Sequence, residues 1–293
     1  MKVKEIRAKS MLVRSRLPDT DYVINPYVGC EFGCLYCYAS YMGRFVNEPI
    51  SNWGNYVYAK VNAVEVLEKE LRSMPAREKN ATIFISSVTD CYQGAEARYR
   101  LTRGILEVLA KEKYPGEIGI LTKSSMVLRD IDLLKQLHDV EVGMTVTTTD
   151  DALSRFLEVR ATLASERLAT LKKLEEAGIK TYAFVGPLLP HFRYRPELLD
   201  ELFAKIAEAK VDSVYVEHIN LKKYIEARLF DSLKNEPEEV REVYKDAEKE
   251  EHRKALDEIV SALLKKYGLK LRTSEVLYHD DYMKKWPWST PAS

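Results

Sequence analysis

The sequence predicts an α/β fold, a partial (β/α)6 barrel of TIM type with a C-terminal helical extension. Three observations support this prediction: short apolar, β-branched segments alternate with amphipathic helical segments, the alternation gives six strands, and it stops beyond Asn220. Strands that alternate with helices pair in parallel through right-handed crossovers. Six units are fewer than the eight of a closed barrel. We therefore expect a barrel domain over residues 1–220 and a helical extension over residues 221–293.

The individual elements follow from hydrophobic periodicity. Helical segments carry apolar residues three and four positions apart, whereas strand segments are short apolar runs. The first strand is expected to end at Asn25-Pro26-Tyr27-Val28-Gly29, and residues 40–60, rich in Tyr, Asn and Gly, are expected to be irregular. The expected helices are 61–73, 98–113, 129–138, 164–177 and 196–209. The other expected strands are 81–87, 117–122, 140–147, 179–185 and 213–219.

The extension is expected to contain one long helix. Residues 236–258 hold ten acidic and five basic side chains, and apolar residues at helical spacing continue to Leu263. One face of this helix should pack on the barrel while the acidic remainder faces solvent. The tail contains Trp286-Pro287-Trp288, which we expect to cover one end of the barrel because tryptophan is rarely left in solvent.

Composition excludes several classes of protein. Hydrophobic residues make up 46% and charged residues 31%, and no run approaches 18 apolar positions. A disordered chain and a membrane span are therefore not expected. The N-terminal segment is basic and lacks the apolar core of a signal peptide, which predicts a cytoplasmic protein. The 45 basic residues balance 45 acidic ones, so bulk charge does not favour nonspecific binding of nucleic acid.

Three of the four cysteines form one compact motif. Cys30, Cys34 and Cys37 have the spacing C-x3-C-x2-C, and Cys91 lies far along the chain. Three thiolates in one loop can hold a [4Fe–4S] cluster and leave one iron open to another ligand. A structural zinc ion usually takes four protein ligands. The alternative is a non-catalytic zinc or iron–sulfur electron-transfer protein, for which Cys91 is a candidate fourth ligand.

The motif, with Tyr36 just before its last cysteine, resembles the signature of the radical SAM superfamily. In that family the open iron binds the amino and carboxylate groups of S-adenosylmethionine (SAM). One electron then cleaves the sulfonium, and the resulting 5′-deoxyadenosyl radical abstracts a hydrogen atom. The resemblance implies a [4Fe–4S] cluster and SAM as cofactors, an electron donor such as ferredoxin or flavodoxin, and a partial barrel.

Polar residues follow the predicted strands at their carboxyl ends, where barrel enzymes place their chemistry. Ser87 and Asp90 follow the second strand, Lys123 the third and Thr145 the fourth. SAM needs such a mixture of cations, hydroxyls and acceptors, so these four and Tyr36 are candidate cofactor contacts. His218, beside Glu217 at the end of the sixth strand, is a candidate for substrate contact.

Longer blocks resemble the spore photoproduct lyase-like branch of the superfamily. They include residues 89–96, 101–103, 122–124, 129–134, 157–160 and 167–168. This resemblance implies that Lys123 pairs with the SAM carboxylate and that Thr145 donates a hydroxyl to the cofactor. It also implies that Glu158 and Arg167 lie near the same cofactor or brace the loop above it.

Two positions depart from the branch, because Cys91 and Val159 stand where it usually has proline. An S–H bond is weak, so Cys91 could donate hydrogen to a substrate radical, and Tyr92 could pass on a second hydrogen. Cys91 could equally be a buried packing residue or a cluster ligand. The branch itself uses a cysteine as hydrogen donor nearer to the position of Ser87, so that role does not transfer directly to Cys91.

The branch favours a nucleic-acid lesion or a modified nucleotide as substrate. Balanced charge and the acidic extension argue against long duplex DNA. The first sixteen residues, with six basic side chains and one acidic, form the one candidate segment for binding a polyanion. Sequence alone does not identify the substrate.

Overall fold

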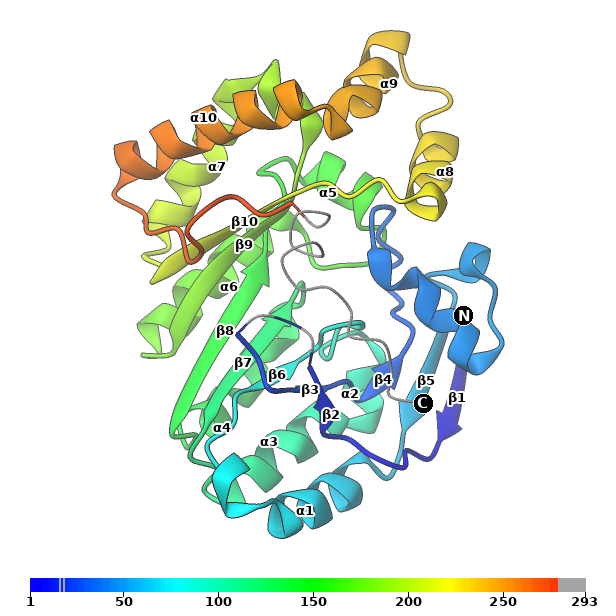
Figure 1. Ribbon diagram of the computed structural model, residues 1–293, viewed down its shortest axis with the longest axis vertical. Helices are drawn as coiled ribbons and strands as arrows, with labels where there is room; N and C mark the ends of the chain where they lie inside the picture. The colour runs from blue at the N-terminus through cyan, green and yellow to red at the C-terminus, as the bar shows by residue number, and fades with distance from the viewer. Residues whose placement is uncertain (16, 18, 279–293) are drawn as a thin grey trace.

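The fold is taken from a computed structural model, which describes residues 1–15, 17 and 19–278. Its main sheet has the strand order β10-β9-β8-β7-β6-β3-β2 (Figure 1). The six strands from β3 to β10 pair in parallel and in sequence order, and β2 pairs antiparallel with β3 at the edge. These strands are β2 (Val13–Arg14), β3 (Tyr22–Ile24), β6 (Ile83–Ile85), β7 (Glu117–Thr122), β8 (Asp139–Thr145), β9 (Lys180–Leu188) and β10 (Ser213–His218). The predicted partial barrel of six parallel strands is confirmed.

Helices connect the parallel strands. In chain order they are α1 (Ala63–Ser73), α2 (Ala95–Tyr99), α3 (Leu101–Lys111), α4 (Ile131–Leu134), α5 (Asp151–Leu157), α6 (Ala164–Glu176) and α7 (Pro196–Glu208), with short 3-10 turns η3 (Ala76–Glu78), η4 (Ser125–Asp130) and η5 (Pro190–Arg193). The helix predicted over 98–113 is interrupted at Arg100, which separates α2 from α3 and has a φ of +50°. The helix predicted over 129–138 is too long. The 3-10 turn η4 ends at Asp130, and α4 is a single turn that ends at Leu134.

A second, smaller sheet corrects the prediction that residues 40–60 are irregular. It has the order β1-β5-β4, formed by β1 (Lys2–Ile6), β5 (Tyr56–Lys60) and β4 (Tyr27–Val28). Between β4 and β5 lie the 3-10 helices η1 (Tyr38–Val46) and η2 (Ile50–Asn52). The basic N-terminal segment, expected as a site for polyanions, therefore contributes a strand that pairs in parallel with β5.

The extension contains three helices rather than one, namely α8 (Lys223–Ser232), α9 (Glu238–Lys245) and α10 (Glu250–Tyr267), with η6 (Asp246–Glu248) between the last two. Lys249 has extended backbone angles and separates α10 from η6. Leu256, Val260 and Leu263 of α10 are buried, and α10 packs on α7 (Figure 1). The Trp286-Pro287-Trp288 tail lies outside the described residues.

After α10 the chain returns to the open edge of the sheet. The amides of Arg272 and Leu277 donate to the carbonyls of Val214 and Val216 at 2.8 and 2.9 Å. This segment therefore runs along β10 and satisfies its edge groups, which would otherwise be free to pair with another chain. Barrel and extension share hydrogen bonds at this edge.

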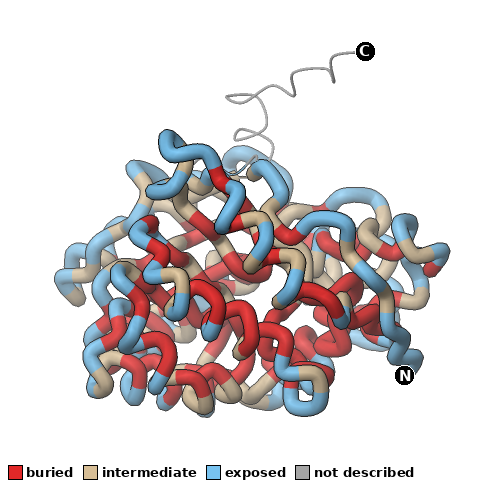
Figure 2. The backbone as a smooth tube through the Cα atoms, turned by 90° about the horizontal axis from the view of Figure 1, so that it is seen from below, coloured by how far each residue is buried: buried red, intermediate tan, exposed pale blue. Residues whose placement is uncertain are grey.

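The core lies on and around the parallel sheet. Figure 2 shows buried backbone through the middle of the molecule and exposed backbone around its rim. Strand residues such as Ile85, Ile120, Val142, Val185 and Val216 have no exposed surface, as expected for parallel strands covered by helices. Within the described part of the chain, no helix combines the length and apolar character that a bilayer crossing requires.

Candidate functional site

The cysteine loop, residues 29–38, is held by the backbone conformation of Gly29 and by hydrogen bonds with Thr89 and Leu157. Gly29 has a φ of +87°, and a Cβ there would lie 2.5 Å from the carbonyl oxygen of Tyr56. Thr89, which follows β6, donates its hydroxyl to the Gly29 carbonyl at 2.6 Å. The amide of Leu35 donates to the carbonyl of Leu157, at the end of α5, at 2.8 Å. The loop therefore lies at the carboxyl end of the barrel.

The thiols of Cys30 and Cys34 are buried and that of Cys37 is partly buried, and all are free. Burial raises the pKa of Cys30 well above its usual value, and negative charge on Asp90, Cys34 and Cys37 adds to this. Burial raises the pKa of Cys34 to about 12, although the nearby Lys123 lowers it. These mutual effects place the three thiols within electrostatic reach of one another.

This donor set fits an iron–sulfur cluster. Burial disfavours the thiolates of this loop, and a bound cation would offset that effect because it stabilises them. Three cysteines on one loop leave one iron of a cube without a protein ligand. Among the described residues, no group of three or more His, Cys, Asp or Glu side chains is arranged around a single metal-ion position.

Lys123 reaches the cysteine loop from the end of β7. Its Nζ lies 5.7 Å from the centre of the Tyr36 ring. Burial alone would lower the pKa of Lys123, but negative charge on Cys34, Glu158 and Cys37 raises it overall. The structure thus brings together the predicted residues Lys123, Tyr36 and the cysteines.

Asp90 fixes the backbone beneath Lys123. Its carboxylate accepts hydrogen bonds from the Thr122 hydroxyl at 2.7 Å, the Lys123 amide at 2.8 Å and the Tyr92 amide at 2.9 Å. Burial raises the pKa of Asp90, although these bonds oppose the shift. A carboxylate with three protein donors ties the end of β6 to the end of β7, and its predicted contact with a cofactor remains a prediction.

Glu158 and Arg167 form a fully buried ion pair. Glu158 also accepts hydrogen bonds from the hydroxyls of Tyr36 and Ser154, and Arg167 donates to the carbonyl of Thr145 at 2.8 Å. Since both side chains are enclosed by protein, they brace the Tyr36 segment of the cysteine loop. Their predicted closeness to the cofactor remains a prediction.

Ser87 and Thr145 line the ends of β6 and β8. The Ser87 hydroxyl accepts a hydrogen bond from the Asn25 side chain at 2.9 Å, and its carbonyl accepts one from the Tyr38 hydroxyl. Thr145 is buried. Their predicted contacts with a cofactor remain predictions.

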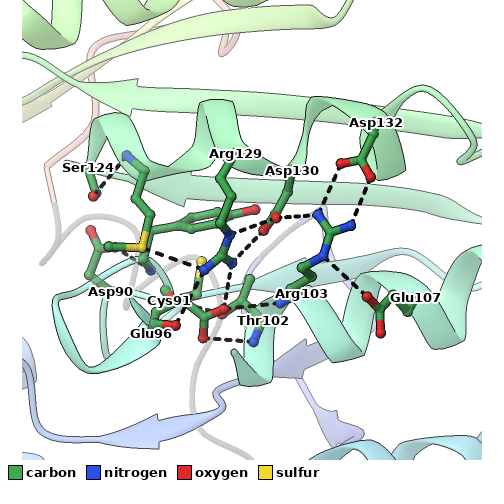
Figure 3. A network of polar contacts seen from close by, with 12 residues as sticks. Asp90, Cys91, Glu96, Thr102, Arg103, Glu107, Ser124, Arg129, Asp130 and Asp132 are labelled. Carbon is green, nitrogen blue, oxygen red and sulfur yellow. Dashed lines mark hydrogen bonds and ion pairs between the residues drawn. The ribbon is translucent and has the colours of Figure 1, made fainter. Parts of the chain in front are cut away.

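Cys91 and Tyr92 are buried residues of the main core. Cys91 belongs to the main core, whereas Cys30 and Cys34 belong to a separate core cluster. The Cys91 carbonyl accepts from Thr102 at 2.6 Å, within the polar network of Figure 3. The Tyr92 ring lies against Arg129, with 5.9 Å between the guanidinium and the ring centre. Cys91 has no exposed surface, and its roles as hydrogen donor, packing residue or ligand remain predictions. The Tyr92 ring lies beside the network around Arg129.

That network is structural. Glu96 accepts hydrogen bonds from Arg129 at 2.8 Å and from the Thr102 amide at 2.9 Å, and Arg103 bonds Asp130 at 2.8 Å (Figure 3). Carboxylates and guanidinium groups neutralise one another here, so the network joins α2, α3 and η4. The buried hydroxyl of Tyr92, whose ring lies beside Arg129, has no hydrogen-bond partner.

Glu217 and His218, at the end of β10, contact different parts of the molecule. The Nε2 atom of His218 lies 2.8 Å from an oxygen of Asp257 on α10, so this histidine anchors the extension. Glu217 lies on the opposite face of the strand, where burial raises its pKa to about 7. Its negative charge also raises the pKa of Tyr38, which places Glu217 toward the cysteine loop.

Two arginines near the loop were missed by sequence reasoning. Arg160 donates to the carbonyls of Glu31 and Gly54 at 3.1 and 2.7 Å, and Arg228 of α8 donates to two further loop carbonyls. Arg160 lies within a block that was noted for its resemblance, but its contacts join segments more than a hundred residues apart. No local sequence pattern indicates Arg228.

Comparison with known proteins identifies the family of the chain. The family model described as the radical SAM superfamily matches residues 24–202. An uncharacterized protein of Methanocaldococcus jannaschii is 32% identical over 268 residues, which cover 91% of this chain and 95% of that protein. An uncharacterized protein of Mycobacterium tuberculosis is 32% identical over 205 residues, covering 69% of this chain and 59% of the relative, so the chain spans about three fifths of its length.

Among solved structures, spore photoproduct lyase complexed with dinucleoside spore photoproduct aligns with a TM-score of 0.69 at 15% identity, over 92% of this chain and 82% of that one. At this identity the likeness concerns the fold. The match covers the partial barrel together with most of the extension. The chain belongs to the radical SAM superfamily, and it is a radical SAM enzyme with the fold of the spore photoproduct lyase-like branch.

Proposed function

We propose that Cys30, Cys34 and Cys37 hold a [4Fe–4S] cluster and that Lys123 binds the carboxylate of SAM at the open iron. The observation that carries this proposal is the approach of Lys123 to the cysteine loop. Its charge lowers the pKa of both Cys34 and Cys37. An ammonium group beside a three-thiolate site is suited to the carboxylate of a ligand held there.

When bound, the cluster and SAM supply one-electron cleavage of the sulfonium and hydrogen-atom abstraction from a substrate, with ferredoxin or flavodoxin as the proposed electron donor. The protein supplies position and water exclusion. Burial of Cys30 and Cys34 keeps water from the thiolates. Asp90 orients the backbone of Lys123, and Glu158 holds the hydroxyl of Tyr36.

Anaerobic reconstitution tests the proposal. The parent protein should bind about four irons per chain and form methionine and 5′-deoxyadenosine from SAM with a low-potential reductant. Cys34→Ala should lose both the intact cluster and cleavage, whereas Cys91→Ala, the matched cysteine outside the loop, should retain both. Zinc in an anaerobic preparation, without iron-dependent cleavage, would overturn the proposal.

We further propose that the substrate contains nucleotides. An aromatic surface formed by Tyr38, Tyr41, Arg44 and Phe45 directly follows the last cysteine of the motif. Tyr38 and Phe45 are 42% and 62% exposed. The Arg44 guanidinium lies 5.1 and 4.7 Å from the ring centres of Tyr41 and Phe45. Aromatic rings beside a cation are suited to stacked bases and a phosphate backbone.

Fluorescence anisotropy with a labelled single-stranded oligonucleotide tests this substrate class. Phe45→Ala and Arg44→Gln should each weaken binding by about tenfold, in line with one stacking contact. Lys266→Gln is the control, since it removes a cation that lies 5.0 Å from the Tyr267 ring centre on α10. Equal affinities for all four proteins would exclude the aromatic surface as the binding site.

A further inference from the structure

Helix α8 of the C-terminal extension contacts the cysteine loop directly. The Nε and Nη2 atoms of Arg228 donate to the carbonyls of Leu35 and Cys37 at 2.7 and 2.8 Å. One turn earlier, the Tyr224 hydroxyl donates to the Tyr38 carbonyl at 3.2 Å. In Figure 1, α8 lies beside the N-terminal segment coloured blue. The extension thus bonds the backbone of the cysteine motif itself.

One nitrogen of the Arg228 guanidinium donates no hydrogen bond. Its Nη1 atom is buried and has no hydrogen-bond partner, and no carboxylate of the described residues lies within salt-bridge distance of the group. Burial lowers the pKa of Arg228, whereas negative charge on Cys37 and Cys34 opposes the shift. Arg228 is partly buried, and a cation removed from water without a counter-ion is costly. Its position is explained if the fold provides an anion on the side of the cysteines.

We propose that Arg228 is a positioning residue for the iron–sulfur cluster, with Nη1 donating a hydrogen bond to a sulfur of the cluster or of its thiolates. The inference rests on the proposed function, because it requires the cluster at Cys30, Cys34 and Cys37. Reduction adds one electron from a low-potential one-electron donor and makes the cluster more negative. A nearby cation and donor stabilise that state, so Arg228 raises the reduction potential.

A second arginine, Arg160, distinguishes an electrostatic effect of Arg228 on the cluster from a purely structural effect on the loop backbone. Arg160 also donates to a loop carbonyl, that of Glu31, and to the carbonyl of Gly54 outside the loop. The cations with the largest effects on the pKa values of Cys34 and Cys37, however, are Lys123, Arg167 and Arg228. Arg160 is therefore the matched control: it bonds the same loop through the Glu31 carbonyl and is not among these cations.

The test is a redox titration of the reconstituted full-length protein, monitored by electron paramagnetic resonance in the absence of SAM. Arg228→Gln should retain about four irons per chain and show a midpoint potential lower by about 59 mV, which corresponds to a tenfold change in a one-electron equilibrium. Arg228→Lys keeps the charge but loses the planar donor, so it should fall between Gln and the parent. Arg160→Gln should keep the parental potential.

The outcomes are distinguishable. A parental potential in any Arg228 variant that holds the full cluster overturns the inference, and so does an equal shift in Arg160→Gln, since loop loosening would then explain it. If Arg228→Gln fails to hold iron, Arg228→Lys carries the comparison. Failure of the parent protein itself to bind a cluster would instead overturn the proposed function.

Discussion

The buried pair of Glu158 and Arg167 gives a quantitative test of how the cysteine loop is supported. Neither side chain is exposed. Glu158 also accepts hydrogen bonds from Ser154 at 3.1 Å, from Thr147 at 3.3 Å and from Tyr36. Glu158→Gln preserves the size of the side chain, removes its charge and replaces one acceptor oxygen with an amide donor. That donor would face groups that already donate.

The expected loss follows from the desolvation of Arg167. Removing one partner of a buried ion pair costs about 3–5 kcal/mol, because the remaining charge is buried without compensation. We expect Glu158→Gln to lower the free energy of unfolding by this amount, measured by urea denaturation at neutral pH. The control is Glu208→Gln, whose carboxylate is 65% exposed and lies 2.9 Å from Lys205. An exposed pair of this kind contributes at most about 1 kcal/mol.

The pH dependence has a definite sign. Burial alone would raise the pKa of Glu158, but Arg167, Lys123 and the hydrogen bonds lower it overall, from an ordinary value of 4.5. A carboxyl with a lowered folded pKa contributes stability above its unfolded pKa and loses it as pH falls through the folded pKa. The difference between parent and Glu158→Gln should therefore be constant near neutrality and shrink well below pH 4.5. A cost no larger than that of Glu208→Gln would refute this reasoning.

Three further predictions concern single side chains. Lys123→Ala should weaken SAM binding to the reconstituted protein by about 1.5–3 kcal/mol in calorimetry, the range of a hydrogen bond to a charged group, with iron content unchanged; unchanged affinity would place Lys123 outside the SAM site. Cys91→Ala should keep iron and SAM cleavage and lower the free energy of unfolding by about 1–2 kcal/mol, as expected for a small buried deletion; lost iron would instead indicate a ligand. Glu217→Gln should leave the free energy of unfolding unchanged near pH 4.5 and increase it by up to about 3 kcal/mol at pH 8. The reason is that a folded pKa of about 7 makes ionisation of this carboxyl destabilise the folded state as pH rises. Equal pH profiles of the two proteins in urea denaturation would show that the pKa of Glu217 is the same in the folded and unfolded states.

Six parallel strands were predictable because burial on both faces makes each strand a continuous apolar run. The second sheet was not predictable, since β1 pairs Lys2 with Tyr56 and nothing local in either segment specifies its partner. The extension was predicted as one helix because amphipathic periodicity continues through residues 236–263. Periodicity carries no information about the break at Lys249, which is a matter of backbone angles.

At the site, the sequence predicted which residues gather but not what each one contacts. Lys123 was expected beside the cofactor, and the structure places its charge near the cysteine thiols. Glu158 belongs to one of the blocks that resemble the family, as do other candidate residues, yet its partners are protein groups. A carboxylate that binds a ligand and one that braces a loop have the same residue type, so only tertiary contacts distinguish them.

The cysteine loop is bonded by three parts of the fold that lie far apart in sequence. Thr89 after β6, Arg160 before α6 and Arg228 on α8 each donate to its carbonyl groups. Donors fixed on separate elements restrict the backbone of the loop before any ligand binds, which reduces the conformational entropy that cluster binding must remove. Because one of the three donors comes from the extension, residues beyond 220 act on the same loop as the barrel. The predicted boundary between residues 220 and 221 therefore separates two segments of the chain that both bond the cysteine loop.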